Sequence, residues 1–144
     1  MKAQCKNMYQ NARQLAGLTQ LMAAEYLNVS VRSLADYETN RTIPPEDIVC
    51  AMDKLYNARW LVYMHMKQNT LLGRIYLPDV EFSDVAKSVL RLQKEMHDLS
   101  KINNSMIEIA CDGIVDKYEE QKWERITKEV DDVAGAAMAL IFSK

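Results

Sequence analysis

The side chains that are best suited to chemistry lie close together between residues 30 and 41. Arg32 has a planar guanidinium that can give two parallel hydrogen bonds to the edge of a guanine, and Val31 can touch the methyl group of a thymine. Asp36 can accept a hydrogen bond from a cytosine, but its charge would repel phosphates, so rejecting wrong bases or pairing with Arg32 suits it better. Asn40 and Arg41 follow and can bind phosphate groups. These side chains are of types that can contact double-stranded DNA. The alternative is that their helix only completes a small core and that its free face is exposed to solvent.

Two short helices joined by a tight turn would position these side chains. Thr19 can cap the first helix through its hydroxyl, and Ser30 can cap the second. Between them stands Asn28, the type of residue after glycine that best tolerates the left-handed conformation of a sharp helix end. The apolar residues predicted to pack are Leu21, Ala24, Tyr26 and Leu27 in the first helix and Val31, Leu34 and Tyr37 in the second. The free face of the second helix then carries Arg32, Ser33, Ala35 and Asp36.

The segment resembles the lambda-repressor and Cro type of helix-turn-helix, the XRE family, over roughly residues 5–57. The pattern consists of Leu18, Thr19, Gln20, Ala24, Leu27, Val29, Ser30, Leu34, Tyr37, Glu38, Asn40, Ile43 and Pro44. The chain departs from it at Asn28, where the turn usually has glycine, and at Ala23, where a larger apolar residue is usual. The resemblance implies a five-helix DNA-binding domain whose third helix, about residues 30–38, enters the major groove.

The resemblance also implies roles for individual residues. It pairs Arg13 in the first helix with Glu38 at the end of the third, and it places Gln20, at a helix N-terminus, on a phosphate. The alternative for Arg13 and Glu38 is that they are two exposed charges of little energetic weight. The residues expected to bind DNA are Gln20, Ser30, Val31, Arg32, Ser33, Ala35, Asp36, Asn40 and Arg41.

Composition agrees with a helical protein whose charge is divided by region. The chain has 144 residues, is 49% hydrophobic, and contains only 4 Gly and 3 Pro, which favours an all-α fold. Its net charge of −2 hides an asymmetry, because residues 1–70 have a net charge of +2 and the remainder −4. Only the first half is therefore expected to face phosphate.

The rest of the chain offers little for catalysis or metal binding. The three cysteines, Cys5, Cys50 and Cys111, are far apart, as in a protein of a reducing cytoplasm. His65 and His97 have no second ligand at metal-binding spacing, and we expect both to be surface or interface residues. No serine–histidine–aspartate set, phosphate loop or metal motif can be assembled, so we expect no enzyme activity, cofactor or metal. No membrane-spanning run or signal-peptide core is apparent, so we expect a cytoplasmic protein.

Residues that interrupt helices divide the chain into three parts. A first helix is predicted at about residues 3–16, a fourth beginning near Pro45, and a fifth at about residues 58–70. Gly73, Pro78 and Asp79 mark a break. The predicted organisation is a helix-turn-helix DNA-binding domain at residues 1–70, a linker at 71–82 and a helical oligomerisation region at 83–144.

Two apolar stripes run through the C-terminal region at alternating steps of four and three residues, which is a heptad pattern. The residues expected to mediate oligomerisation are Val85, Val89, Leu92, Met96, Leu99, Asn103, Met106, Ile126, Val130, Val133, Ala137 and Leu140. Asn103 at a seam position can fix the register of partner helices. A hairpin and one long bent helix (coiled coil) both fit this pattern, with Asp112 and Gly113 or the stretch 100–104 as the break.

The sequence therefore predicts a transcriptional regulator of the bacterial or phage repressor type, which binds operator DNA as a homodimer or higher oligomer. The alternative is a protein-interaction adaptor, in which the helix-turn-helix is a scaffold and the acidic helical tail binds another regulator.

Overall fold

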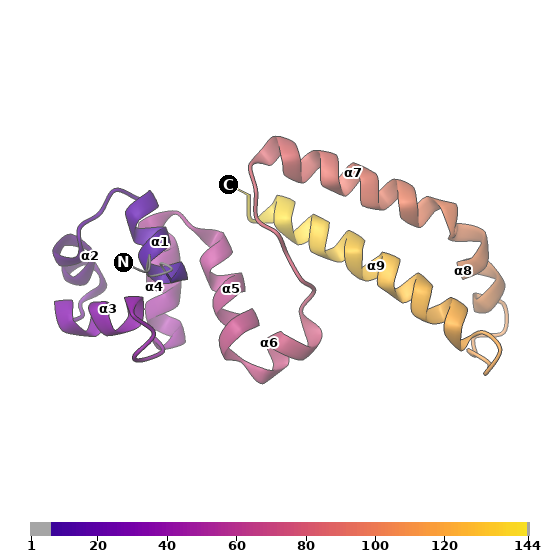
Figure 1. Ribbon diagram of the computed structural model, residues 1–144, viewed down its shortest axis with the longest axis horizontal. Coiled ribbons are helices and arrows are strands. Elements are labelled where there is room, and N and C mark those ends of the chain that lie inside the picture. The colour runs from indigo at the N-terminus through magenta and orange to yellow at the C-terminus, as the bar shows by residue number, and fades with distance from the viewer. Residues whose placement is uncertain (1–6, 144) are drawn as a thin grey trace, which may run out of the picture. The chain divides into compact units, whose positions relative to one another are not determined.

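The computed structural model describes residues 7–143, which are helical apart from short connections and contain no strand. The predicted all-α class is therefore confirmed. The chain divides into two compact units, residues 1–77 and residues 78–144. Figure 1 shows the helices of each unit.

The described part of the first unit, from residue 7 onward, has six helices: α1 (Met8–Leu15), α2 (Gln20–Leu27), α3 (Val31–Glu38), α4 (Glu46–Tyr56), α5 (Arg59–Asn69) and α6 (Leu71–Tyr76). The predicted caps are confirmed, because the Thr19 hydroxyl accepts a hydrogen bond from the Met22 amide and the Ser30 hydroxyl accepts one from the Ser33 amide. Asn28 adopts the left-handed conformation with φ of 53°. These local features turn the chain sharply between α2 and α3. The predicted start of the first helix near residue 3 lies outside the described residues.

The core of the first unit forms where α1, α2, α3, α4 and α5 meet. Its buried residues include Leu34, Val49, Met52 and Leu61, each at most 1% exposed. In α2 the buried residues are Ala23, Ala24 and Leu27, whereas Leu21 and Tyr26 are 59% and 73% exposed. The prediction that Leu21 and Tyr26 pack inward is therefore wrong. The buried face of α2 instead includes the small Ala23, which lets α2 lie close to its neighbours.

The segment predicted as a linker begins with a helix. Residues 71–76 form α6, which Thr70 caps by accepting a hydrogen bond from the Gly73 amide at 2.8 Å. The Lys67 ammonium then donates to the Leu77 carbonyl at 2.5 Å, which holds the end of this segment against α5. An extended stretch follows from residue 78 to residue 84.

The second unit is a helical hairpin, which is one of the two arrangements that the sequence left open. Helix α7 (Val85–Lys101) is followed by α8 (Asn103–Ala110) after an interruption at Ile102, and α9 (Glu120–Ile141) returns antiparallel to α7 (Figure 1). The turn contains Gly113 with φ of 75°, a backbone conformation that favours glycine. At the open end, the rings of Phe82 and Phe142 pack edge to face, with centroids 6.4 Å apart.

The residues of α7 and α8 that are buried against α9 are not those of the predicted heptad series but lie beside it on the helix surface. Ser88 and Ile109 are 1% and 3% exposed, and Glu95 and Ile102, at the heptad positions between them, are half-buried. By contrast, Val85 and Met96 of the predicted seam are 51% and 54% exposed. The hairpin therefore buries one edge of a wide apolar face and leaves the other edge open.

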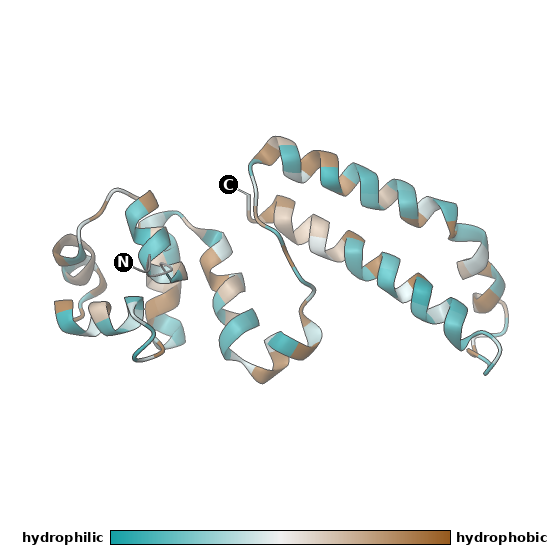
Figure 2. Cartoon of the chain, viewed as in Figure 1, coloured by the Kyte–Doolittle hydropathy of each residue, from teal (hydrophilic) through white to brown (hydrophobic). Residues whose placement is uncertain are grey.

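The predicted oligomerisation residues consequently fall into three groups. Ile126 is buried; Leu92, Leu99, Met106, Val133, Ala137 and Leu140 are half-buried; and Val85, Val89, Met96, Asn103 and Val130 are exposed. Figure 2 shows hydrophobic and hydrophilic residues alternating along α7, while the C-terminal half of α9 is more hydrophobic.

Candidate nucleic-acid interface

Helix α3 is attached to the first unit by a buried ion pair. Arg13 on α1 and Glu38 at the end of α3, which were expected to pair, form two parallel hydrogen bonds: Nε to Oε1 at 2.5 Å and Nη2 to Oε2 at 2.9 Å. Their side chains are 8% and 0% exposed. Arg13 also donates to the Leu18 carbonyl at 2.6 Å, so one guanidinium joins α1, α3 and the start of α2. The hydrogen bond to Glu38 raises the pKa of Arg13.

Gln20 joins this cluster. Its amide nitrogen donates to Oε2 of Glu38 at 2.8 Å, so part of the side chain that was expected on a phosphate is directed inward. The first-turn backbone amides of α2 remain at the same place, and such groups attract anions.

The predicted base-reading residues lie together on α3. Val31 is 41% exposed, so the prediction that it packs inward beside Leu34 is wrong. Arg32 is exposed at the first turn, while Ser33, Ala35 and Asp36 are half-buried. Within the described chain, Arg32 makes no hydrogen bond or ion pair. The Ser30 and Ser33 hydroxyls are 2.8 Å apart, which orders the N-terminal end of this face. Arg32 is therefore free to donate to a ligand.

The loop after α3 folds back onto the end of that helix. The Arg41 amide donates to the Asp36 carbonyl at 2.9 Å. Asp36 also lies 3.5 Å from the Arg41 guanidinium, so it pairs with Arg41 instead of Arg32. Asn40 has φ of 57°, and its side-chain oxygen accepts a hydrogen bond from the Asn7 amide at 3.0 Å. The Arg41 side chain is still 76% exposed, so it remains available for a phosphate.

A second buried polar cluster supports the same unit and was missed from the sequence. His65 on α5 is only 4% exposed, so its prediction as a surface or interface residue is wrong. The Tyr9 hydroxyl lies 2.7 Å from Nδ1 of His65, and Asn69 donates to the same hydroxyl at 3.2 Å. Tyr9 and His65 share this hydrogen bond, and which of them donates is set by the ring nitrogen that carries the imidazole proton. Burial lowers the pKa of His65 and raises that of Tyr9 to about 12. The only sequence signal was helical spacing, because His65 and Asn69 are four residues apart.

A family model described as helix-turn-helix matches residues 10–60, which span α1 to the start of α5. Together with the turn at Asn28 and the exposed face of α3, this match decides the identity of the first unit. The chain contains a lambda-repressor/Cro-type helix-turn-helix domain. Helix-turn-helix domains of this type bind DNA in regulators of the XRE family. No curated protein and no solved structure gives a significant match to the chain. None of the described helices has the length and apolar character needed to cross a membrane.

Proposed function

We propose that this protein is a sequence-specific transcriptional regulator that binds operator DNA through α3 and acts as a homodimer. The observation that carries the proposal is the unpartnered Arg32 on the exposed face of a helix that a buried ion pair fixes in place. A guanidinium held in a major groove can give two hydrogen bonds to guanine O6 and N7, while Val31 contacts a thymine methyl group. Arg41, Asn40 and the amides at the start of α2 set the register by binding phosphates.

The experiment is a selection from a random pool of duplex DNA with the purified full-length chain, followed by titration of the selected operator. We expect Arg32→Ala to weaken binding by about 1–3 kcal/mol and to relax the preference at one guanine per half-site. Lys54→Ala is the matched control, because it removes an exposed positive charge from α4 and should leave the base preference unchanged. Equal affinity and equal base preference for wild type and Arg32→Ala would contradict the assignment.

Arg41→Ala should act differently from Arg32→Ala, because a phosphate contact carries no sequence information. We expect the affinity to fall by the same factor for all operator variants. The slope of log affinity against log salt concentration should also become shallower by about one. If no DNA sequence is enriched and binding depends only on salt, the chain is better explained as a protein-interaction adaptor.

The proposed homodimer forms through the open edge of the C-terminal hairpin. A groove of about 620 Å³ lies there, lined mostly by apolar side chains of α7, α8 and α9. They are Leu92, Met96, Leu99, Ser100, Asn103, Met106, Val133 and Ala137. The two packed helices of the hairpin form a single layer. The apolar face of such a layer is normally covered by a second layer of helices or strands.

A second copy of the hairpin fits this groove in size and pattern. With 17 residues, α7 is about 25 Å long, and two helices side by side are about 20 Å wide, so the face covers about 500 Å² before side-chain relief is counted. This is about three fifths of the about 800 Å² per partner of a standard interface, and side-chain relief adds to it. The exposed heptad residues on both helices could then interdigitate in a four-helix bundle, with Asn103 setting the register. Dimerisation would present two α3 helices to half-sites about 34 Å apart.

Sedimentation of the full-length chain and two matched variants tests the dimer. Met96→Glu puts a charge in the groove, whereas Leu90→Glu puts the same charge on α7 at a side chain that is 70% exposed and does not line it. We expect wild type and Leu90→Glu to be dimeric and Met96→Glu to be monomeric with weaker operator binding. A monomeric wild type, or identical behaviour of the two variants, would contradict the proposal.

A further inference from the structure

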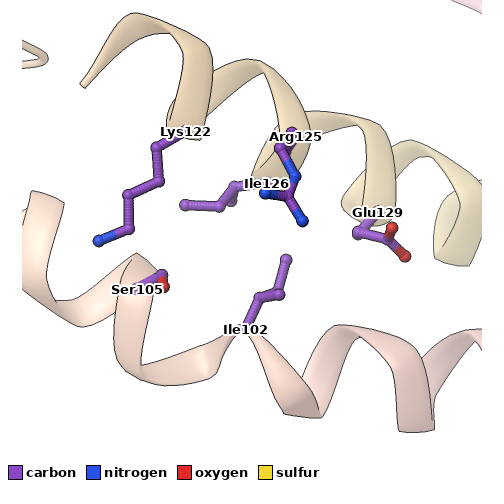
Figure 3. Close-up of a pocket in the computed structure, with 6 residues that line it drawn as sticks. All are labelled: Ile102, Ser105, Lys122, Arg125, Ile126 and Glu129. Atoms are coloured by element: carbon purple, nitrogen blue, oxygen red, sulfur yellow. The ribbon is translucent and has the colours of Figure 1, made fainter. Parts of the chain in front are cut away.

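A cavity of about 250 Å³ lies in the hairpin where α8 packs against the first turns of α9. Its position follows from the interruption at Ile102, whose φ and ψ of −103° and 6° separate α7 from α8. The lining residues are Ile102, Ser105, Lys122, Arg125, Ile126 and Glu129 (Figure 3). All six belong to the second unit, so the cavity is separate from the helix-turn-helix domain.

The lining is divided into apolar, cationic and acidic parts. Ile126 is 2% exposed and faces Ile102 across the cavity, while Lys122 and Ser105 lie at one end and Glu129 at the other (Figure 3). The Arg125 side chain lies between these ends (Figure 3). A ligand that fits this lining must have an apolar body and charged groups of both signs.

The two cations of the cavity differ in how they are engaged. Lys122 Nζ donates to Glu108 at 2.7 Å, so its charge is already compensated. Arg125 makes no hydrogen bond or ion pair within the described chain, although Glu129 stands one helical turn away. Arg125 is therefore available to a carboxylate.

The acidic end has more negative charge than Glu129 alone provides. Carboxylate oxygens of Glu129, Glu95 and Asp132 all lie within 4.8 Å of one another. Lys94 is shared between Glu95 at 3.2 Å and Asp98 at 3.1 Å. Lys128 is 4.0 Å from Asp132, so lysines compensate only part of this negative charge. An ammonium group placed at Glu129 would reduce the mutual repulsion of these carboxylates.

From this arrangement we propose that the cavity binds a small zwitterionic amino acid with a branched apolar side chain. Its carboxylate would accept hydrogen bonds from Arg125, its ammonium would donate to the neighbouring Glu129, and its side chain would pack on the two isoleucines. The volume of about 250 Å³ leaves room for several water-sized groups, and therefore for a ligand of this size. L-Leucine has this shape and charge.

Titration calorimetry of the full-length chain without DNA provides the test, so its outcome is independent of the proposed operator binding. The probes are L-leucine, isocaproate, which lacks the ammonium, and isoamylamine, which lacks the carboxylate. We expect L-leucine to bind at least about ten-fold more tightly than either of the others, because a charge-assisted hydrogen bond is lost in each case. Equal binding of L-leucine and isocaproate, or no binding of L-leucine, would overturn the proposal.

Matched variants on α9 locate the site. Arg125→Gln should weaken L-leucine binding at least about ten-fold, and Glu129→Gln should weaken L-leucine binding while leaving isocaproate binding unchanged. Lys117→Gln removes an exposed positive charge from the turn before α9, outside the cavity and the acidic cluster, and should leave the affinity for L-leucine unchanged. Helix content and melting temperature are measured for each variant to establish that it is folded. If Arg125→Gln is folded and binds L-leucine like wild type, the cavity is not the binding site.

Discussion

Removal of Glu38 should destabilise the helix-turn-helix domain far more than removal of an ordinary surface charge. In Glu38→Ala, the Nε and Nη2 groups of Arg13 lose their acceptors and Gln20 loses its partner, while the bond from Arg13 to the Leu18 carbonyl remains. The stranded guanidinium lies in a side chain that is only 8% exposed, so water cannot replace the carboxylate fully. The domain should therefore lose a large part of its stability.

The magnitude follows from the burial of both partners. Breaking a buried ion pair by removing one charge costs about 3–5 kcal/mol, against a total domain stability of about 5–15 kcal/mol. Arg13→Ala should cost a similar amount, because it leaves the fully buried Glu38 carboxylate with Gln20 as its remaining side-chain partner. The double variant should lose about as much as one single variant, because no charge is then left without its partner.

Tryptophan fluorescence during urea unfolding can follow this domain by itself. The chain has 2 tryptophans, Trp60 in the first unit and Trp123 in the second. In a Trp123→Phe background, Trp60, which packs against the core, reports only the unfolding of the helix-turn-helix domain. Separating the units in this way permits a two-state analysis of one of them.

The exposed pair of Arg41 and Asp36 is the control. Its atoms are 3.5 Å apart and the Arg41 side chain is 76% exposed, so alanine at either position should cost a few tenths of a kcal/mol and the two losses should add. If Arg13→Ala and Glu38→Ala also cost less than about 1 kcal/mol and combine additively, the reasoning from burial is refuted.

Three further predictions concern single residues. Because burial lowers the pKa of His65 below its usual 6.5, the native state binds protons less readily than the unfolded state; stability should fall as the pH drops below about 6.5, and urea midpoints should lose this dependence in His65→Gln but keep it in His97→Gln. Gly135→Ala should lower the melting temperature of the second unit, measured by Trp123 fluorescence, although alanine normally strengthens a helix by about 1 kcal/mol, because a Cβ would lie 2.6 Å from the Asp79 carbonyl oxygen; an increase would contradict the packing. Asn28→Ala should destabilise the helix-turn-helix domain by about 1–2 kcal/mol in the urea assay, and Asn28→Gly should not, because φ is 53° at this position.

The sequence alone determined the features that depend on near neighbours along the chain. Thr19 and Ser30 cap helices through amides three residues away, and Asn28 ends α2 through its own backbone preference. Such interactions need no distant partner, so residue type and spacing were sufficient to predict them. They also fixed where α3 begins, and therefore which side chains lie at the N-terminal end of its exposed face.

Tertiary structure decided which hydrogen-bond partner each long polar side chain has. Gln20 donates to Glu38, 18 residues away, and Tyr9 binds His65, 56 residues away. The sequence shows that these groups can form hydrogen bonds, but burial of one group makes a particular partner necessary, and burial depends on how all the helices pack.

The C-terminal hairpin shows the same division. The heptad spacing determined that the region is helical with a wide apolar face. Ser88 and Ile109, but not Val85 and Met96, ended in the buried row because the register is set by the side chains of the facing helix. On α9, Ala136 and Ala139 are small and buried, so the size of the side chains, and not hydrophobicity alone, decided which edge of the face was covered. The buried Gly135 lies instead against the Asp79 carbonyl.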